Sequence, residues 1–284
     1  MNKLQQTRIV SMDTWSECIT KIPFYASLLF LMVVAGMQTY TKFFVLCPIV
    51  GKITIIEVIV NIISSPLHYF LVLGGLFIYL MRAPYFCRAD ALLLPRLGRG
   101  PWIWGKVLFV AEYSLLAILL IYAFATILCF PYIDFTRCTW TTSYVETNQL
   151  GMSMTRMPPL QILLQTFCLN YTFIFLMALI AMLFNLCYSR VASVVVVGGV
   201  CAISTVIENT YIFDNLKRWG LTLQASMYYH RFEGIDNIMG DASKALPTVP
   251  ESLLLFAAGC ILCLILIRYR VRNYDFQLES KGMH

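Results

Sequence analysis

The sequence predicts an all-α membrane protein with six transmembrane helices, N-in/C-in. An N-terminal amphipathic interfacial helix precedes the first span, and a short cytoplasmic helix lies between spans 2 and 3. Of the 284 residues, 59% are hydrophobic and 13% are charged, and the mean hydropathy is +0.73. A soluble domain averages about 45–50% apolar and about 25% charged residues. The composition excludes a disordered chain, a secreted disulfide scaffold and a soluble enzyme with a membrane tail, and residues 1–284 are expected to form one membrane domain.

Residues 8–22 are the first predicted element, an amphipathic helix. The apolar positions that recur every three to four residues are Ile9, Met12, Trp15, Ile19 and Ile22. We interpret this stripe as a helix in the cytoplasmic interface with Trp15 at headgroup depth. The alternative is a surface helix that only anchors the chain. Because no small-residue cleavage site follows the first apolar run, we expect that run to remain as an uncleaved anchor.

The spans are predicted from apolar runs of about 20 residues, the length that a helix needs to cross a hydrocarbon core of about 30 Å. The run from Leu160 to Ile207 would be about 72 Å long as one helix, so we divide it at Tyr188–Arg190. The predicted spans are Pro23–Phe44, Ile59–Met81, Val107–Phe130, Leu160–Leu186, Val191–Ile207 and Ser252–Ile267. Two long outer connections, 131–159 and 208–251, are expected to cap the bundle.

The orientation follows from Lys and Arg, which accumulate on the cytoplasmic side of membrane proteins. With both termini inside, thirteen of the 21 basic residues lie on that side. They are Lys3, Arg8, Lys21, Arg82, Arg88, Arg96, Arg99, Lys106, Arg190, Arg268, Arg270, Arg272 and Lys281. This bias predicts the N-in/C-in topology and explains the net charge of +6 without nucleic-acid binding.

The predicted cytoplasmic loop Arg82–Lys106 contains a short helical candidate at 89–94, which Pro95 is expected to end. Trp102 and Trp104 follow, just before the third span. Topology and an interfacial aromatic belt explain the arginines and tryptophans without any partner. They do not explain Leu92–Leu94, which would be exposed on an isolated loop, so we expect the loop to dock on a soluble protein.

Motifs for chemistry are weak in this chain. Gly100–Lys106 fits the first seven positions of a phosphate-binding loop, but Val107 follows where Ser or Thr is needed and no strand precedes it, so we reject this interpretation. The three histidines are too few and too dispersed for a metal or haem centre. We therefore expect no catalytic residue, no metal site and no cofactor on this chain, and no enzyme activity.

The cysteines are interpreted mainly as small apolar residues inside spans. Cys260 and Cys263 form a C-x-x-C pattern, but they lie inside the last span without charged neighbours. Cys129 and Cys138 lie close in sequence at the predicted outer face, and whether they form a disulfide stays open.

Ionisable residues inside spans are functional candidates because they are costly there. The candidates are His68 and Glu112, with Glu57 at the outer edge. We interpret His68 as an uncharged hydrogen-bonding group of the bundle. Glu112 is expected to extend to the interface or to pair with a neighbouring arginine.

The order of these elements, together with two strings, resembles the ABC-2-type permease subunits of bacterial ABC transporters. The strings are Pro95–Lys106, which enters the third span, and Arg268–Asp275, which leaves the sixth. In that family the loop after span 2 carries the coupling helix, which docks into a groove on the ATPase. The resemblance implies that 88–99 docks here, through Arg88, Asp90, Leu92, Leu93, Leu94, Arg96 and Arg99. Arg88 and Asp90 stand where the family commonly has Glu, which leaves the individual contacts open.

The resemblance also implies the partners: two copies of an ABC ATPase that bind ATP and Mg, and a second permease chain, identical or homologous, in a bacterial cytoplasmic membrane. Small residues for helix packing, within the chain or between permeases, are Gly36, Gly74, Gly75, Gly198 and Gly199. The apolar composition suits export of an amphipathic peptide or lipid-like substrate. The alternatives are a non-transporting membrane scaffold or sensor, which also needs a docking loop, and a membrane-embedded enzyme, which the missing catalytic residues argue against.

Overall fold

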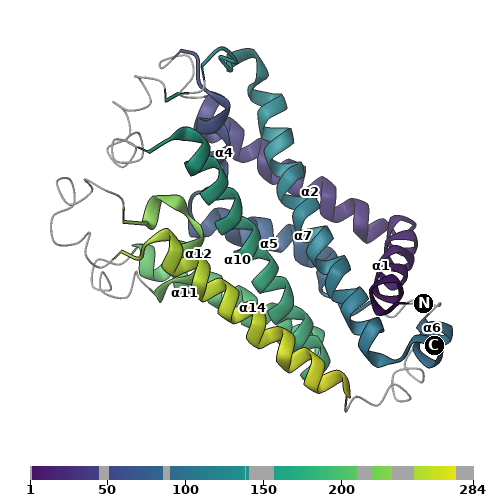
Figure 1. Ribbon diagram of the computed structural model, residues 1–284. Coiled ribbons are helices and arrows are strands. Elements are labelled where there is room, and N and C mark those ends of the chain that lie inside the picture. Colours follow the sequence, from purple (N-terminus) through teal and green to yellow (C-terminus); the bar gives the residue numbers. More distant parts are fainter. Residues whose placement is uncertain are drawn as a thin grey trace.

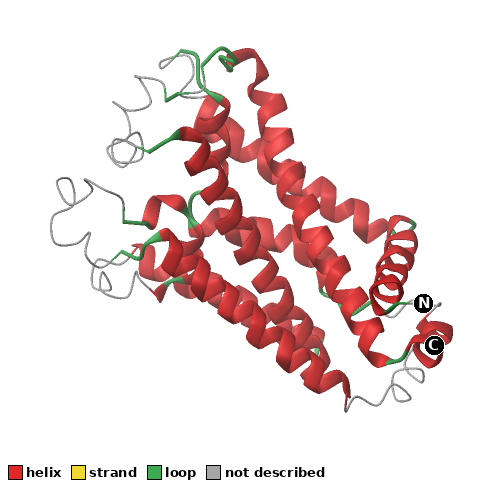
Figure 2. Cartoon of the chain, viewed as in Figure 1, coloured by secondary structure: helices red, strands yellow, loops and turns green. Residues whose placement is uncertain are grey.

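The computed structural model describes residues 2–44, 51–85, 90–137, 139–140, 157–209, 219–231 and 246–272, which form helices and short connections (Figures 1 and 2). The elements are α1 (Lys3–Ile19), α2 (Ile22–Thr39), η1 (Tyr40–Phe44), α4 (Ile55–Ile62), α5 (Pro66–Leu80), α6 (Asp90–Leu97), α7 (Arg99–Cys129), η2 (Phe130–Tyr132), α10 (Pro159–Cys187), α11 (Arg190–Asn209), α12 (Leu221–Ala225), η4 (Met227–Tyr229) and α14 (Val249–Arg272). None of the described residues forms a β-strand; one isolated bridge joins Ile53 to Ile133.

Five helical segments are long and apolar enough to cross a membrane, which makes the chain a multi-pass membrane protein. They are Ile22–Phe44, Arg99–Tyr132, Pro159–Cys187, Arg190–Ile207 and Val249–Arg272. A sixth span is counted only if α4 and α5 together form one span. The division of the long apolar run is confirmed, because α10 ends at Cys187 and α11 begins at Arg190.

The helices form two groups that meet along α7 and α10. In Figure 1, α1, α2 and α7 lie on one side, and α10, α11 and α14 on the other. α10 contacts α7, α11 and α14 and completely buries Leu169, Phe173 and Met177. α5 joins the groups by packing against both α2 and α11.

The prediction of one continuous helix over Ile59–Met81 is wrong. α4 and α5 are separated by residues 63–65 and meet at an angle of 80°. Pro66 lacks a backbone N–H and disfavours the helical conformation of the residue before it, and Ser65 is accordingly extended, with φ −127° and ψ 157°. Pro66 is instead the first residue of α5, where its fixed φ is compatible with a helix.

The third predicted span begins eight residues earlier than expected. α7 starts at Arg99 rather than at Val107, so the end of the predicted loop, Arg99–Lys106, belongs to a helix of 31 residues. Gly98, with φ +80°, supplies the left-handed conformation that separates α6 from α7. As a result Trp102 is a fully buried helix residue and not part of an interfacial aromatic belt.

The five glycines predicted for helix packing differ in how closely neighbouring atoms approach them. A Cβ on Gly75 would lie 2.8 Å from Leu31 Cδ2, so this residue allows α5 to approach α2. A Cβ on Gly36 would make only ordinary contacts, and Gly74, Gly198 and Gly199 have open space beside them among the described residues. Arg88, Cys138 and Lys281 lie outside the described residues, so the Cys129–Cys138 pairing stays a prediction.

Candidate functional site: a clamped helix at one end of the bundle

α6 is fastened to α7 by a buried ion pair. Lys106 Nζ lies 2.9 Å from Asp90 Oδ2, and both side chains are almost completely buried. Trp102 Nε1 donates to the other carboxylate oxygen, Asp90 Oδ1, at 2.8 Å. Trp102 and Lys106 lie four residues apart on one face of α7, and the Lys106 ammonium is 5.7 Å from the Trp102 ring centroid. Asp90 is the first residue of α6, where the helix dipole favours a negative charge.

α1 contributes to the same cluster through Thr14. Lys106 Nζ also donates to Thr14 Oγ1 at 3.0 Å. We call Thr14, Asp90, Trp102 and Lys106 the clamp. It connects α1 to the consecutive helices α6 and α7, which lie far from α1 in the sequence, and all four of its side chains are buried.

Glu112 is a second attachment point for α1. Its Oε2 accepts from Ser11 Oγ at 2.8 Å and from Trp15 Nε1 at 2.6 Å. The Trp15 ring packs edge-on against Phe109, with centroids 4.9 Å apart. Glu112 therefore pairs with two neutral donors on α1, and no arginine among the described residues contacts it.

The buried face of α1 differs from the apolar stripe of the sequence. Val10, Ser11, Thr14 and Cys18 are buried, whereas Ile9, Met12, Ile19 and Ile22 are exposed. A Cβ on Gly105 would lie 2.5 Å from Val10 Cβ, so small residues let α1 and α7 approach closely. The exposed stripe remains free to face a membrane interface. Trp15 does not share that face, because it turns inward to Glu112.

α6 presents a narrower outer face than the sequence predicts. Leu93, Leu94 and Leu97 are half-buried against the core, in register with Asp90 at helical spacing. Leu92 is 65% exposed, and Pro95 and Arg96 are exposed beside it. Of the three leucines that were predicted to dock, Leu92 alone is exposed to solvent. Asp90 faces α7 in the clamp and is not available for docking.

Arg99 ties the end of α14 to the junction of α6 and α7. Its Nη1 donates to the carbonyl oxygens of Arg272 and, at 3.5 Å, Val271. The last carbonyls of a helix are unpaired within it and carry partial negative charge, which a guanidinium satisfies. Arg99 is therefore exposed to solvent and also hydrogen-bonded to the end of α14 in its own chain.

The ionisable residues predicted inside spans do not meet. Glu57 is buried in α4, where its Oε2 accepts from the backbone N of Thr54 at 2.9 Å. His68 is half-buried, and its Nδ1 has no hydrogen-bond partner among the described residues, so the expected hydrogen bond is not seen there. Within the described residues, no contact joins Glu57, His68 or Glu112 to another of the three.

Sequence reasoning missed the polar cluster at the break between α4 and α5. Lys42 Nζ donates to the carbonyl oxygen of Asn61 at 2.6 Å and to Ser64 Oγ. Ser226 Oγ donates to the carbonyl oxygen of Ser64 at 2.7 Å. These bonds satisfy backbone groups that the break releases, as a low-dielectric surrounding requires. The string Ser64-Ser65-Pro66 was the feature of the sequence that could have predicted this break.

No protein-family model, curated protein or solved structure matches this chain. The function must therefore be inferred from the contacts described above. In the described part of the chain, no three His, Cys, Asp or Glu side chains gather where they would hold a metal ion.

Proposed function

We propose that this chain is the membrane-spanning subunit of an ATP-driven ABC-2-type exporter and that α6 is its coupling helix. The observation that carries the proposal is the orientation of α6. Its inner face is anchored through Asp90, and its outer face presents Leu92 with Arg96 beside it. A single exposed leucine flanked by a guanidinium suits insertion into an apolar groove with an acidic rim.

The clamp gives such a helix the means to transmit force. α7 has 31 residues and is about 46 Å long, so it reaches from α6 across a hydrocarbon core. α1 is attached to α7 at Lys106 and Glu112 and leads directly into α2. Because separating a buried ion pair is expensive, a displacement of α6 is passed to α7, α1 and α2 together.

The partners in this proposal are two ABC ATPase chains, which bind ATP and Mg, and a second permease chain. Support for a second permease comes from α11, whose Gly198 and Gly199 have open space beside them. Val195 and Ile203 are exposed on the same helix. The cargo class is an amphipathic peptide or lipid-like molecule, and the membrane is the bacterial cytoplasmic membrane, with α6 on its inner side.

A non-transporting scaffold or sensor is the second candidate, since it would use the same outer face of α6. The two functions differ in the partner that binds there. An ATPase partner supports the transporter, and a partner without ATPase activity supports the scaffold.

Co-purification with ATPase chains encoded beside this one tests the proposal. The Leu92→Asp variant should lose a stoichiometric ATPase, because a carboxylate cannot enter an apolar groove. Phe135→Asp is the matched control: Phe135 is a similarly exposed apolar residue just beyond the opposite end of α7, so the ATPase should be retained. If no ATPase binds to the wild type with or without ATP, or if both variants keep it equally, the coupling role of α6 is refuted.

A further inference from the structure

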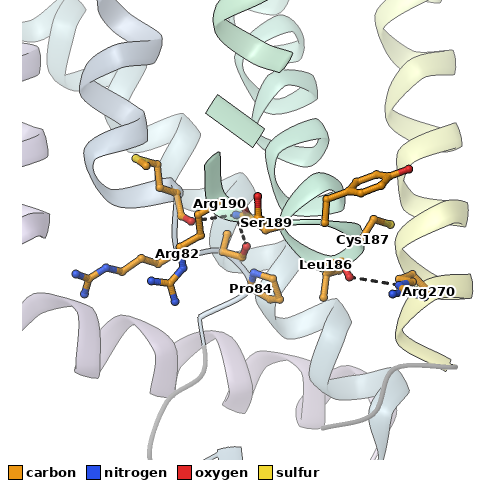
Figure 3. Close-up of a pocket in the computed structure, with 11 residues that line it drawn as sticks. Arg82, Pro84, Leu186, Cys187, Ser189, Arg190 and Arg270 are labelled. Atoms are coloured by element: carbon orange, nitrogen blue, oxygen red, sulfur yellow. Dashed lines mark hydrogen bonds between the residues drawn. The ribbon is translucent and has the colours of Figure 1, made fainter. Parts of the chain in front are cut away.

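A cavity of about 380 Å³ opens where the ends of α5, α10 and α14 meet the start of α11. Its wall includes Arg82, Arg190 and Arg270, from three separate segments (Figure 3). Arg82 and Arg190 lie on one side of the cavity in Figure 3 and Arg270 on the other. The cavity is at the same end of the bundle as α6, because α14 ends at Arg272, whose carbonyl oxygen accepts from Arg99.

The charge of this cavity is uncompensated among the described residues. Its lining includes three arginines and no aspartate or glutamate. The ion pairs found in the described part of the chain involve Lys21, Lys106 and Arg137 and none of the three arginines. Arg270 donates through Nε to the carbonyl oxygen of Leu186 at 3.3 Å, which leaves its two Nη groups for a ligand. Like charges held around one cavity repel each other until an anion enters.

The backbone around the cavity is also arranged for an anion. α11, a helix of 20 residues, begins at the cavity wall, and the positive end of its dipole is there. Ser189 Oγ caps this end by accepting from the backbone N of Ala192 at 3.2 Å. Asn185 Nδ2 donates to the carbonyl oxygens of Met81 and Ala83, at 3.1 and 2.7 Å, which fixes the segment that carries Arg82.

We propose that this cavity binds a phosphate group, and that in the membrane the phosphate belongs to an anionic lipid headgroup. A guanidinium matches the planar, bidentate geometry of phosphate oxygens. The lipid is favoured as the source because the cavity lies at the ends of three helices that are long and apolar enough to span a membrane, which is headgroup depth. Basic pockets between such helices are typical headgroup sites. The inference does not depend on the proposed transport function.

The consequence for the protein is a link between the end of α5 and two helices of the second group, α11 and α14. Arg82 follows α5, Arg190 opens α11 and Arg270 lies near the end of α14. A phosphate held by all three removes their mutual repulsion and fixes three helix ends to one another. We therefore expect the headgroup to stabilise the folded chain.

The test uses the full chain purified in a non-ionic detergent. The probes are short-chain phosphatidylglycerol, short-chain phosphatidylcholine and inorganic phosphate, read by thermal unfolding and by lipid retention in native mass spectrometry. Phosphatidylglycerol should raise the Tm and be retained, and phosphatidylcholine should do neither. An equal Tm rise with inorganic phosphate at the same concentration would overturn the lipid as source. No response to phosphatidylglycerol or phosphate would overturn the site.

The variant Arg82→Gln/Arg190→Gln/Arg270→Gln should weaken phosphatidylglycerol binding by at least about tenfold, the effect of losing one charge-assisted contact. Lys3→Gln/Arg8→Gln/Arg268→Gln removes the same charge from exposed positions outside the cavity and should bind like wild type. Because Arg270 also contacts Leu186, the single variants Arg82→Gln and Arg190→Gln are measured too. These variants should keep the wild-type Tm without lipid and lose affinity. Equal losses in the cavity and control triple variants would show a general surface-charge effect and refute the proposal.

Discussion

Lys106 and Asp90 form a buried ion pair, with Nζ 2.9 Å from Oδ2, that fastens the first residue of α6 to α7. Thr14 and Trp102 satisfy further hydrogen-bonding capacity of the two charged groups. A buried pair of this kind gives little net stability compared with apolar residues of the same size, but it holds one geometry. In this chain the geometry is the position of α6 relative to α1 and α7.

Breaking the pair on one side should therefore be far worse than replacing both sides. Lys106→Met leaves Asp90 buried without its cation and is expected to destabilise the protein by about 3–5 kcal/mol. The double variant Asp90→Leu/Lys106→Met should recover much of this loss. Unfolding in mixed micelles measures both, and a Lys106→Met variant as stable as wild type would contradict a buried pair.

Glu112→Ala should release α1 from α7. The substitution removes the acceptor for Ser11 and Trp15, and hydrogen bonds to a charged group contribute about 1.5–3 kcal/mol each. Hydrogen exchange of residues 3–19 should accelerate while α10 stays protected. Glu17→Ala is the control, because it removes a partly exposed pair with Lys21, which is worth about 0–1 kcal/mol. Unchanged exchange in Glu112→Ala would show that apolar packing alone holds α1.

Gly105→Ala should separate α1 from α7 through steric overlap. The new methyl group would lie 2.5 Å from Val10 Cβ and 2.8 Å from the carbonyl oxygen of Thr7, and overpacking of this kind costs about 1–3 kcal/mol. Gly100→Ala, in the same helix but with nothing within 4 Å, should be neutral or slightly stabilising. The Tm of the two variants is compared directly. Equal values would mean that α1 does not approach α7 at Gly105.

Acid should weaken the attachment of the segment 219–231 to α14. Burial lowers the pKa of His230 to about 4, and its Nε2 lies 3.0 Å from Ser252 Oγ. Between pH 6.5 and 4 the unfolded chain binds a proton at this histidine before the folded chain does, so the free energy of unfolding falls as the pH falls. The loss approaches about 3 kcal/mol below pH 4.

The pH dependence of the Tm between pH 7 and 4 tests this expectation in wild type and in His230→Gln. The variant carries no titrating group at this position, so its profile should be flatter over that range. Parallel profiles would assign the acid sensitivity to other groups.

The candidate site was only partly predictable. Leu92 was correctly expected on a short helix after the second predicted span, but Pro95 does not end that helix: α6 continues to Leu97 and includes Arg96. The inward orientation of Asp90 was not predicted, because its partners Trp102 and Lys106 belong to a stretch that was interpreted as a loop. The contact between Lys106 and Thr14 joins residues 92 positions apart, and local periodicity carries no signal for such a pair. Glu112 was recognised as a candidate, but its partners on α1 were not.

Apolar runs of about 20 residues were enough to locate the helices near Pro23–Phe44, Leu160–Leu186 and Val191–Ile207, since hydropathy within a segment decides whether it is stable in hydrocarbon. Contacts between segments decided the rest. α1 buries Val10 and Ser11 rather than Ile9, Met12 and Ile19 of its apolar stripe, and Gly105 lets the Val10 face approach α7 closely. α7 extends back to Arg99 because its first turns are held by two hydrogen bonds, from Trp102 to Asp90 and from Lys106 to Thr14. Such choices depend on atoms brought together by the fold, and only the tertiary structure reveals them.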